Sequence, residues 1–188
     1  MSIVFRPVLV TAPVGLPVEV SDCKKHAVIE HAESDSLVEE YLSAATAEMD
    51  GFRGILGRAI LTQTWQLQVA GWCTRFLLPV PDVSAVEITY FDEDGAEQSG
   101  PNVTPQAVAT GTMVRIPSNW SRPALEADSD GPVSVKFTCG FDDASAVPSD
   151  IKVAIMQLAA HMFAEREGIS IAEPVYDRLI SKYRWSVI

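Results

Sequence analysis

The sequence is poor in cysteine and in positive charge, and it contains no long run of apolar residues. Its three cysteines, Cys23, Cys73 and Cys139, are widely spaced and form no C-x-x-C pair. This pattern predicts neither a zinc site nor a disulfide framework, and buried free thiols in a reducing compartment are expected instead. No stretch approaches the ~20 apolar residues that a membrane-spanning helix needs. The first seven residues lack the basic start and apolar run of a signal peptide, so we expect synthesis in the cytoplasm and no membrane association.

Basic residues are the scarcer charge class, with 14 lysines and arginines against 25 acidic residues and a formal net charge of −11. An acidic surface repels nucleic-acid phosphates, which argues against a protein that grips DNA. It does not argue against DNA that passes the protein without being bound. At 188 residues, of which 47% are hydrophobic, the chain is long enough for a substantial globular core.

Motifs that carry chemistry are also missing. The sequence has no phosphate-binding G-x-x-x-x-G-K-[ST], no G-x-G-x-x-G and no G-x-S-x-G. Asp92-Glu93-Asp94-Gly95 begins like a calcium loop, but Ala96 stands where the third ligand belongs, so we expect a solvated hairpin tip. The three histidines are not spaced as metal ligands on one helical face. We therefore predict no enzyme activity, no cofactor and no metal site.

Two apolar stripes with helical spacing are the strongest patterns that the sequence does contain. The first runs from Leu37 to Leu56 behind a possible capping box at Ser36, and Gly57 stands where a left-handed helix cap is expected. The second runs from Ile151 to Phe163, behind Pro148 at a favourable first helical position. Between them, alternation with period two predicts strands. The clearest are residues 64–69, 86–91 and 133–139.

These patterns predict an α+β fold, described as a small helical bundle with an antiparallel β insertion. Two long amphipathic helices and short terminal helices would form the bundle, and the insertion would lie between the long helices. We expect a single domain over residues 1–188. Its expected parts are an extended N-terminal arm at 1–19, helices at 20–57, the β insertion at 59–141, and C-terminal helices with a tail at 148–188. The apolar arm is expected to lie on its own chain or on a neighbour.

The order of several short segments along the chain is distinctive. They are the helix that ends at Gly57-Arg58, the strand Leu61–Trp65, Phe76–Pro81 leading into Val83–Val86, Val133–Phe141, Val147-Pro148 with Ile151–Ile155, and Tyr183–Trp185. Together, from about Pro17 to Trp185, they resemble the head–tail connector (adaptor) proteins of long-tailed bacteriophages and gene transfer agents. The family often has tyrosine at the positions of Cys139 and Phe141, and neither departure touches a known chemical role.

The resemblance implies a structural subunit of a virion or phage-like particle, located at the head–tail junction. It implies a cyclic ring of about a dozen subunits between the portal protein and a stopper or tail-terminator protein, with DNA passing through the lumen without specific binding. Connector tails in the family reach the portal, so the portal-contact candidates here lie in the C-terminal stretch: Arg178, Lys182, Tyr183, Arg184 and Trp185. The loops around Asn102 and Trp120 are the candidates for contact with the next ring.

Two other functions remain open at this level. The tryptophan-containing loops would also suit a non-catalytic carbohydrate- or peptide-binding module of a phage-like particle. A metal-dependent hydrolase would have to be built on acidic residues in two loops. These residues are Asp92, Asp94, Asp142 and Asp143.

Overall fold

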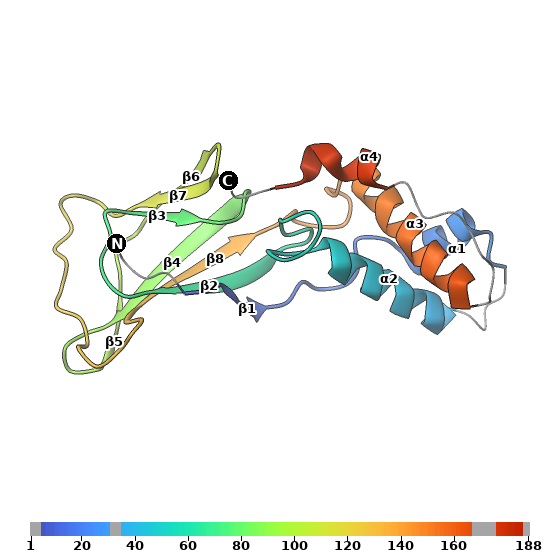
Figure 1. Ribbon diagram of the computed structural model, residues 1–188. Helices are drawn as coiled ribbons and strands as arrows, with labels where there is room; N and C mark the ends of the chain where they lie inside the picture. Colours follow the sequence, from blue (N-terminus) through green and yellow to red (C-terminus); the bar gives the residue numbers. More distant parts are fainter. Residues whose placement is uncertain (1–4, 31–34, 167–175, 186–188) are drawn as a thin grey trace. The chain divides into compact units, whose positions relative to one another are not determined.

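The computed structural model describes residues 5–30, 35–166 and 176–185, and it divides the chain into two compact units. The unit that we call the β unit comprises Met1–Ala12, Thr62–Gly140 and Val187–Ile188. The α unit comprises Pro13–Leu61 and Phe141–Ser186. Each unit is therefore assembled from separate stretches of sequence, which can be followed by colour in Figure 1. The expectation that the whole chain acts as one connector domain stays a prediction.

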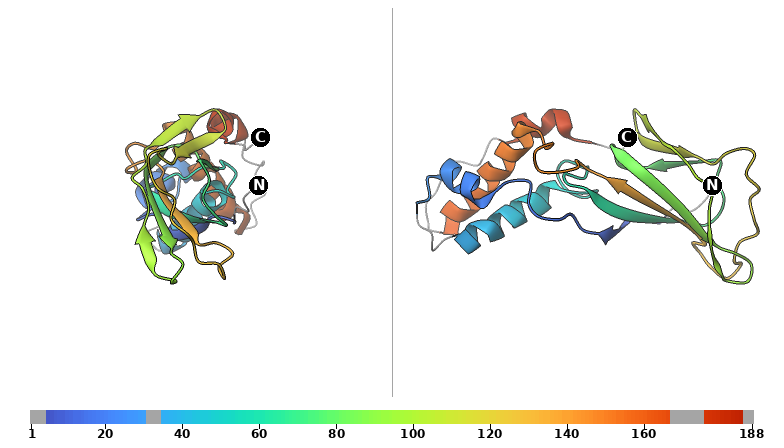
Figure 2. Two further views of the ribbon diagram at one scale, coloured as in Figure 1. Left: turned by 90° about the vertical axis from the view of Figure 1, so that its left-hand side faces the viewer. Right: turned by 180° about the vertical axis from the view of Figure 1, so that it is seen from behind.

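Two antiparallel sheets make up the β unit. The larger sheet has five strands in the order β1-β2-β8-β4-β5, and the smaller has three in the order β3-β7-β6. Figure 2 shows the same strands from behind. Their bounds are β1 Val8–Thr11, β2 Gln63–Val69, β3 Arg75–Leu78, β4 Val83–Phe91, β5 Glu97–Ser99, β6 Pro105–Val108, β7 Gly111–Arg115 and β8 Val133–Cys139.

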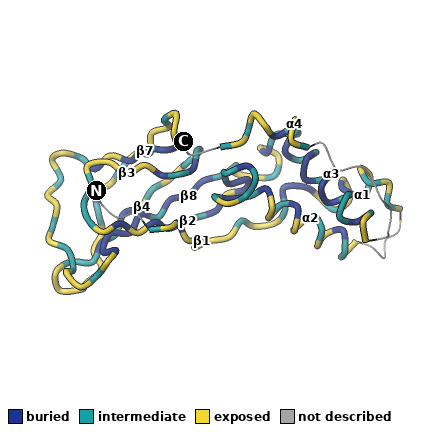
Figure 3. The backbone as a smooth tube through the Cα atoms, in the orientation of Figure 1, coloured by how far each residue is buried: buried dark blue, intermediate teal, exposed yellow. Residues whose placement is uncertain are grey.

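The central strand of the larger sheet is β8, and its apolar positions form the middle of the core. Phe137 is 1% exposed and lies opposite Trp65 of β2 on one side and Val86 of β4 on the other. Val135 is likewise flanked by Leu67 and Ile88. Alternating β-branched and aromatic residues favour this position because their side chains pack against cross-strand neighbours on both sides. The tube in Figure 3 shows β8 as the most continuously buried strand of this sheet.

The smaller sheet is held together by one close backbone approach and one buried hydroxyl. Gly111 has φ +140°, and a side chain there would come within 2.3 Å of the Leu78 carbonyl oxygen, so β3 and β7 can approach only because this residue is glycine. The buried Thr112 hydroxyl donates to the Val80 carbonyl at 3.0 Å. This bond satisfies a polar group that would otherwise destabilise the core.

Four α-helices and one 3₁₀ helix are found among the described residues, and all belong to the α unit. Helices α2 and α3 carry most of its core, with α1 and α4 packed against α3. Their bounds are α1 Val20–Ala27, α2 Asp35–Met49, α3 Ser149–Arg166 and α4 Asp177–Ile180, and the 3₁₀ helix η2 spans Ser181–Tyr183. In the described parts of the chain, no helix is both long enough and apolar enough to cross a bilayer.

A compact loop follows α2 where the sequence predicts more helix. The Asp50 carboxylate accepts the Ile60 amide at 2.6 Å, and the amide of Leu56 donates to the Met49 carbonyl at 3.1 Å. Gly51, with φ +80°, follows the end of the helix, and Gly57, with φ +63°, provides a second left-handed position within the loop. Leu56 is still fully buried, so the apolar stripe reaches the core through a loop rather than through a longer helix.

The predicted helical bundle with a β insertion is wrong. The fold is α+β, but the described residues form eight strands in two antiparallel sheets and only four α-helices, of which the longest has 18 residues. The physical reason is that the strands build a core of their own. Residues 96–111 have few apolar side chains, yet they contain β5 and β6 because their backbones pair with β4 and β7. Part of the N-terminal arm is a strand as well, since β1 pairs with β2.

Candidate docking surfaces

The C-terminal stretch proposed from the resemblance is folded back onto the α unit. It consists of α4 and η2, followed by Arg184 and Trp185 in extended backbone. Ile180 is 0% exposed and belongs to the same hydrophobic core as α2 and α3, with Leu179 and Tyr183 packed beside it. The fully buried side chain of Ile180 therefore anchors this stretch to the core.

Asp150, at the start of α3, contacts two of the candidate residues. Its carboxylate accepts a hydrogen bond from the Lys182 ammonium at 2.6 Å and lies 3.5 Å from the Tyr183 hydroxyl. The Lys182 ammonium also lies 5.0 Å from the centre of the Tyr183 ring. The hydrogen bond from Lys182 lowers the pKa of Asp150, and the same bond raises the pKa of Lys182. Both groups are therefore charged at neutral pH, and the pair holds η2 near the N-terminus of α3.

The remaining portal-contact candidates differ in the contacts that they make within the α unit. Arg184 pairs with Asp177, seven residues earlier in the chain, at 2.6 Å. The Trp185 amide donates to the Leu56 carbonyl at 2.7 Å, and Trp185 is half-buried. Arg178 is exposed, and among the described residues its guanidinium has no ion-pair partner. Arg178 is thus the candidate side chain that is presented outward, whereas Trp185 is a structural contact of the post-α2 loop.

The two loops suggested for contact with the next ring are both in the β unit. Their candidate residues differ in exposure and in contacts with the rest of the unit. Asn102 is exposed in the connection between β5 and β6. Trp120 is half-buried and packs edge to face on Trp72, with ring centres 4.7 Å apart, and on Tyr90, with centres 6.2 Å apart. The Trp72 indole donates to the Pro123 carbonyl at 3.0 Å. The three rings fix the loop after β7 to β4, so Trp120 is an anchor of this loop.

Two of the four acidic residues considered for metal chemistry, Asp92 and Asp143, accept hydrogen bonds from backbone amides. Asp92 accepts the amides of Asp94 and Ala96 at 3.1 and 2.9 Å, which lowers the pKa of its carboxyl, the Ala96 bond most of all. Asp143 accepts the hydroxyl and amide of Ser145, both at 2.6 Å, and the hydroxyl bond contributes most to lowering its pKa. These are turn-stabilising carboxylates. Among the described residues no group of three or more His, Cys, Asp or Glu side chains is placed to hold a metal ion.

The three cysteines are free thiols in different surroundings. Cys23 and Cys139 are each 1% exposed, while Cys73 is half-buried with its sulfur 3.8 Å from the Gly71 carbonyl. Burial raises the pKa of the Cys23 thiol to about 11, so this group stays protonated at neutral pH. The thiolate is the reactive form, and Cys23 is therefore expected to be inert in the folded protein.

We expect one thiol per chain to react quickly with a disulfide reagent such as DTNB at pH 8, and three after denaturation. The fast thiol should be Cys73, because it alone is partly exposed. A Cys73→Ser variant is the control, and it should lose the fast phase while keeping the two slow ones. Fast reaction of Cys23 in the folded state would contradict the burial described above.

Several residues that shape these surfaces escaped sequence reasoning. Asp150 was expected only as a favourable first-turn residue of a helix, yet it binds Lys182, which lies 32 positions later. Leu56 contributes its carbonyl to Trp185, and a backbone acceptor leaves no signal in a sequence. The Trp72–Tyr90–Trp120 cluster joins residues that are distant in sequence, so no local pattern indicates it.

Comparison with solved structures finds the same fold in proteins of gene transfer agent particles. The chain matches a protein in the neck of an empty particle, computed with C6 symmetry, at 23% identity and a TM-score of 0.77. It matches proteins in a native virion and in a native neck computed with C12 symmetry at 24% and 23% identity, each with a TM-score of 0.74. In all three cases 98% of this chain and 97% of the other are covered.

No curated protein sequence matches the chain. A family model does match it, over residues 18–170, and this family is described as the head completion protein. The match spans α1, the β unit from β2 onward and all of α3. It confirms the resemblance noted in the sequence and the predicted class of function, a structural head–tail connector. The chain belongs to the head completion protein family.

Proposed function

We propose that this protein forms a ring at the head–tail junction of a phage-like particle, between the portal and a stopper or tail-terminator protein. The observation that carries this proposal is the family match over residues 18–170, together with a fold shared over nearly the whole chain with proteins of gene transfer agent particles. Two of those particles' necks were computed with C6 and C12 symmetry, which supports a cyclic assembly of about a dozen copies here.

The net charge suits a ring through which DNA moves. With 25 acidic against 14 basic residues, the subunit offers a surface that repels phosphates rather than holding them. A lumen lined by such subunits would let the duplex pass without specific binding. The function needs no catalytic step, and the described acidic clusters serve as turns.

The portal contact is proposed for the C-terminal segment, Asp177–Trp185. It carries Arg178, Lys182 and Arg184 against the single acidic residue Asp177, in a chain that is otherwise strongly acidic. Lys182 and Arg184 are held in place by Asp150 and Asp177, so their side chains are ordered before any partner arrives. Arg178 is exposed, and we assign it the direct contact with an acidic portal surface. Tyr183 and Trp185 then act by fixing the segment to the α unit.

Contact with the next ring is proposed for the β5–β6 connection around Asn102 and the loop around Trp120. Both lie in the β unit, and Asn102 is exposed. The aromatic cluster pins the Trp120 loop to the sheet, so this loop would present a fixed surface rather than one that orders on binding.

The experiment is the molar mass of the chain by light scattering, alone and mixed with the portal protein encoded with it. We expect a small species alone and a portal-plus-ring mass in the mixture, because ring closure on a template adds avidity. Arg178→Glu should weaken portal binding by about tenfold or more through reversal of a contact charge. Failure of the wild-type chain to bind its portal at any salt concentration would overturn the proposal.

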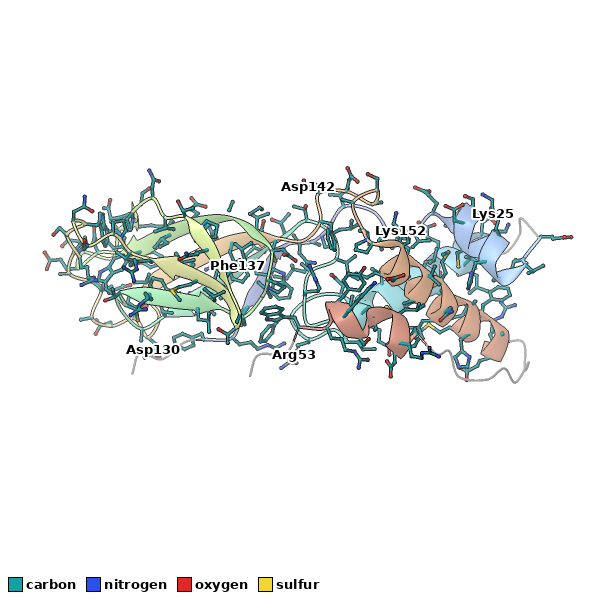
Figure 4. The ribbon with its side chains drawn as sticks, turned by 90° about the horizontal axis from the view of Figure 1, so that it is seen from above. Lys25, Arg53, Asp130, Phe137, Asp142 and Lys152 are labelled. Atoms are coloured by element: carbon teal, nitrogen blue, oxygen red, sulfur yellow. The ribbon has the colours of Figure 1, made fainter. Side chains whose placement is uncertain are left out.

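Arg53→Glu is the matched control. Arg53 is an exposed arginine of the same unit, labelled in Figure 4, and among the described residues it has no ion-pair partner. Its reversal changes the net charge as much as Arg178→Glu does. Equal losses in the two variants would point to overall charge and would remove the assignment of Arg178.

A further inference from the structure

Strand β1, Val8–Thr11, is a mostly apolar edge strand whose side chains are all exposed within the described part of the chain. Val8, Leu9 and Val10 are 63%, 41% and 50% exposed. They are three of the large exposed hydrophobic residues among the described positions, and Figure 3 shows the whole strand as exposed. Single exposed aliphatic residues are ordinary, but three in a row on a sheet edge are not.

The strand is fixed in place on its inner side. The Phe5 amide donates to the Gln68 carbonyl at 2.9 Å, and Val8 and Leu9 pair with Gln66 and Trp65 of β2. Pro7, just before the strand, is buried. The arm therefore lies on its own body along one edge, and its outer edge remains free because β1 is the last strand of the five-stranded sheet.

Soluble proteins usually blunt such edges with charged residues or with proline inside the strand. β1 has neither, although a register shift between Leu9 and Thr11 forms a bulge that shortens the regular edge. Val8 and Leu9 precede the bulge and Val10 lies at it, and all three are exposed. The surface is therefore suited to apolar packing with a short stretch of backbone pairing rather than to an extended shared ladder.

We propose that β1 is a lateral contact of the ring, covered by a neighbouring copy of this chain. This inference rests on the proposed function and names the partner of one of its surfaces. Charge selects the second copy. Identical subunits of net charge −11 repel one another, so they meet most favourably through a patch without charge, and β1 contains none.

The size of the patch fits assembly on a template. The surface area of three aliphatic side chains is far smaller than the ~800 Å² that each partner buries in a standard stable interface. Free chains are therefore expected to associate weakly through β1, and the contact becomes effective when many copies are held around a portal.

The test uses the full-length chain with Leu9→Asp and Leu9→Thr. Leu9→Thr keeps a residue that favours strands, so it separates loss of apolar packing from loss of β1 itself. Val14→Asp is the control, since Val14 is 94% exposed and lies outside β1. The readouts are self-association by sedimentation at high concentration, the mass of the portal complex, and the melting temperature.

We expect both Leu9 variants to weaken self-association by about tenfold or more, with Asp the stronger. They should load fewer copies onto the portal and keep the wild-type melting temperature, while Val14→Asp should behave as wild type. Unchanged association of both Leu9 variants, or no association of the wild type in any condition, would overturn the inference. If the wild type ignores the portal but Leu9→Asp still reduces self-association, the proposed function fails and the β1 contact stands.

Discussion

Replacing Phe137 by alanine is expected to lower the free energy of unfolding by about 3–5 kcal/mol, the usual cost of emptying a fully buried aromatic site. Phe137 is 1% exposed and lies on the central strand, β8, between Trp65 of β2 and Val86 of β4. Figure 4 labels it among the strands of the β unit. Neighbours on both sides are held in hydrogen-bonded ladders, so the site cannot collapse around the cavity.

Urea unfolding followed by tryptophan fluorescence is the measurement, because Trp65, Trp72 and Trp120 all belong to the β unit. Lys136→Ala is the matched control. It makes the same replacement one residue earlier on β8, where the side chain is only half-buried. Its expected loss is below about 1 kcal/mol. A loss of similar size in both variants would mean that strand propensity, not the packing of Phe137, sets the stability of β8.

Gly57→Ala is expected to destabilise the α unit by about 2–3 kcal/mol and to release the C-terminal segment. Gly57 has φ +63°, a backbone conformation that costs a residue with a side chain about 1–2 kcal/mol. An alanine Cβ there would also lie 2.1 Å from the Trp185 carbonyl oxygen. Trp185 must then move, which breaks the hydrogen bond from its backbone amide to the Leu56 carbonyl. Losing this hydrogen bond lowers the stability by about another 1 kcal/mol.

Gly15→Ala is the control for Gly57→Ala, because it should introduce the backbone strain without the steric clash. Gly15 has φ +76°, but a side chain there meets no atom within 4 Å. It should therefore show only the strain of about 1–2 kcal/mol. Hydrogen exchange supplies the second readout, since the Trp185 amide should lose protection in Gly57→Ala and keep it in Gly15→Ala. Equal stability losses with a protected Trp185 amide in both variants would refute the clash.

The sequence predicted those elements whose own side chains determine their packing. The alternation from Val133 to Cys139 corresponds to β8 residue for residue, and Pro148 stands directly before α3. Both are decided locally, by which face of a strand or helix is apolar. The resemblance was read correctly for the same reason, since it depended on the order of such segments.

The parts that were mispredicted depend on contacts between distant residues. The stripe from Leu37 to Leu56 keeps helical spacing, yet α2 ends at Met49 because Asp50 binds the Ile60 amide and Gly51 takes a left-handed backbone. β5 has only exposed polar residues, so its pairing with β4 leaves no apolar pattern. The fold class was therefore judged from the helices, although the sheets form a core of their own.

For the candidate site too, the contacts between distant residues could not be predicted from the sequence. The resemblance seen in the sequence proposed the C-terminal segment as the portal contact. It could not show that Asp150 holds Lys182, that Leu56 holds Trp185, or that Arg178 is the side chain left outward. Residue-level contacts with the portal and with the next ring stay predictions.

The position of β8 in the sheet also constrains the order in which the chain can fold as it leaves the ribosome. β2 and β4 are made early, but both pair with β8, and Thr64 meets Thr138 across 74 residues. The α unit likewise waits for α3, because α2 has to pack against it. Neither unit can close before the stretch from Val133 onward has been synthesised. A nascent chain shorter than this would display the edges of β2 and β4 that β8 later covers, so the chain is most prone to aggregation until β8 has been synthesised.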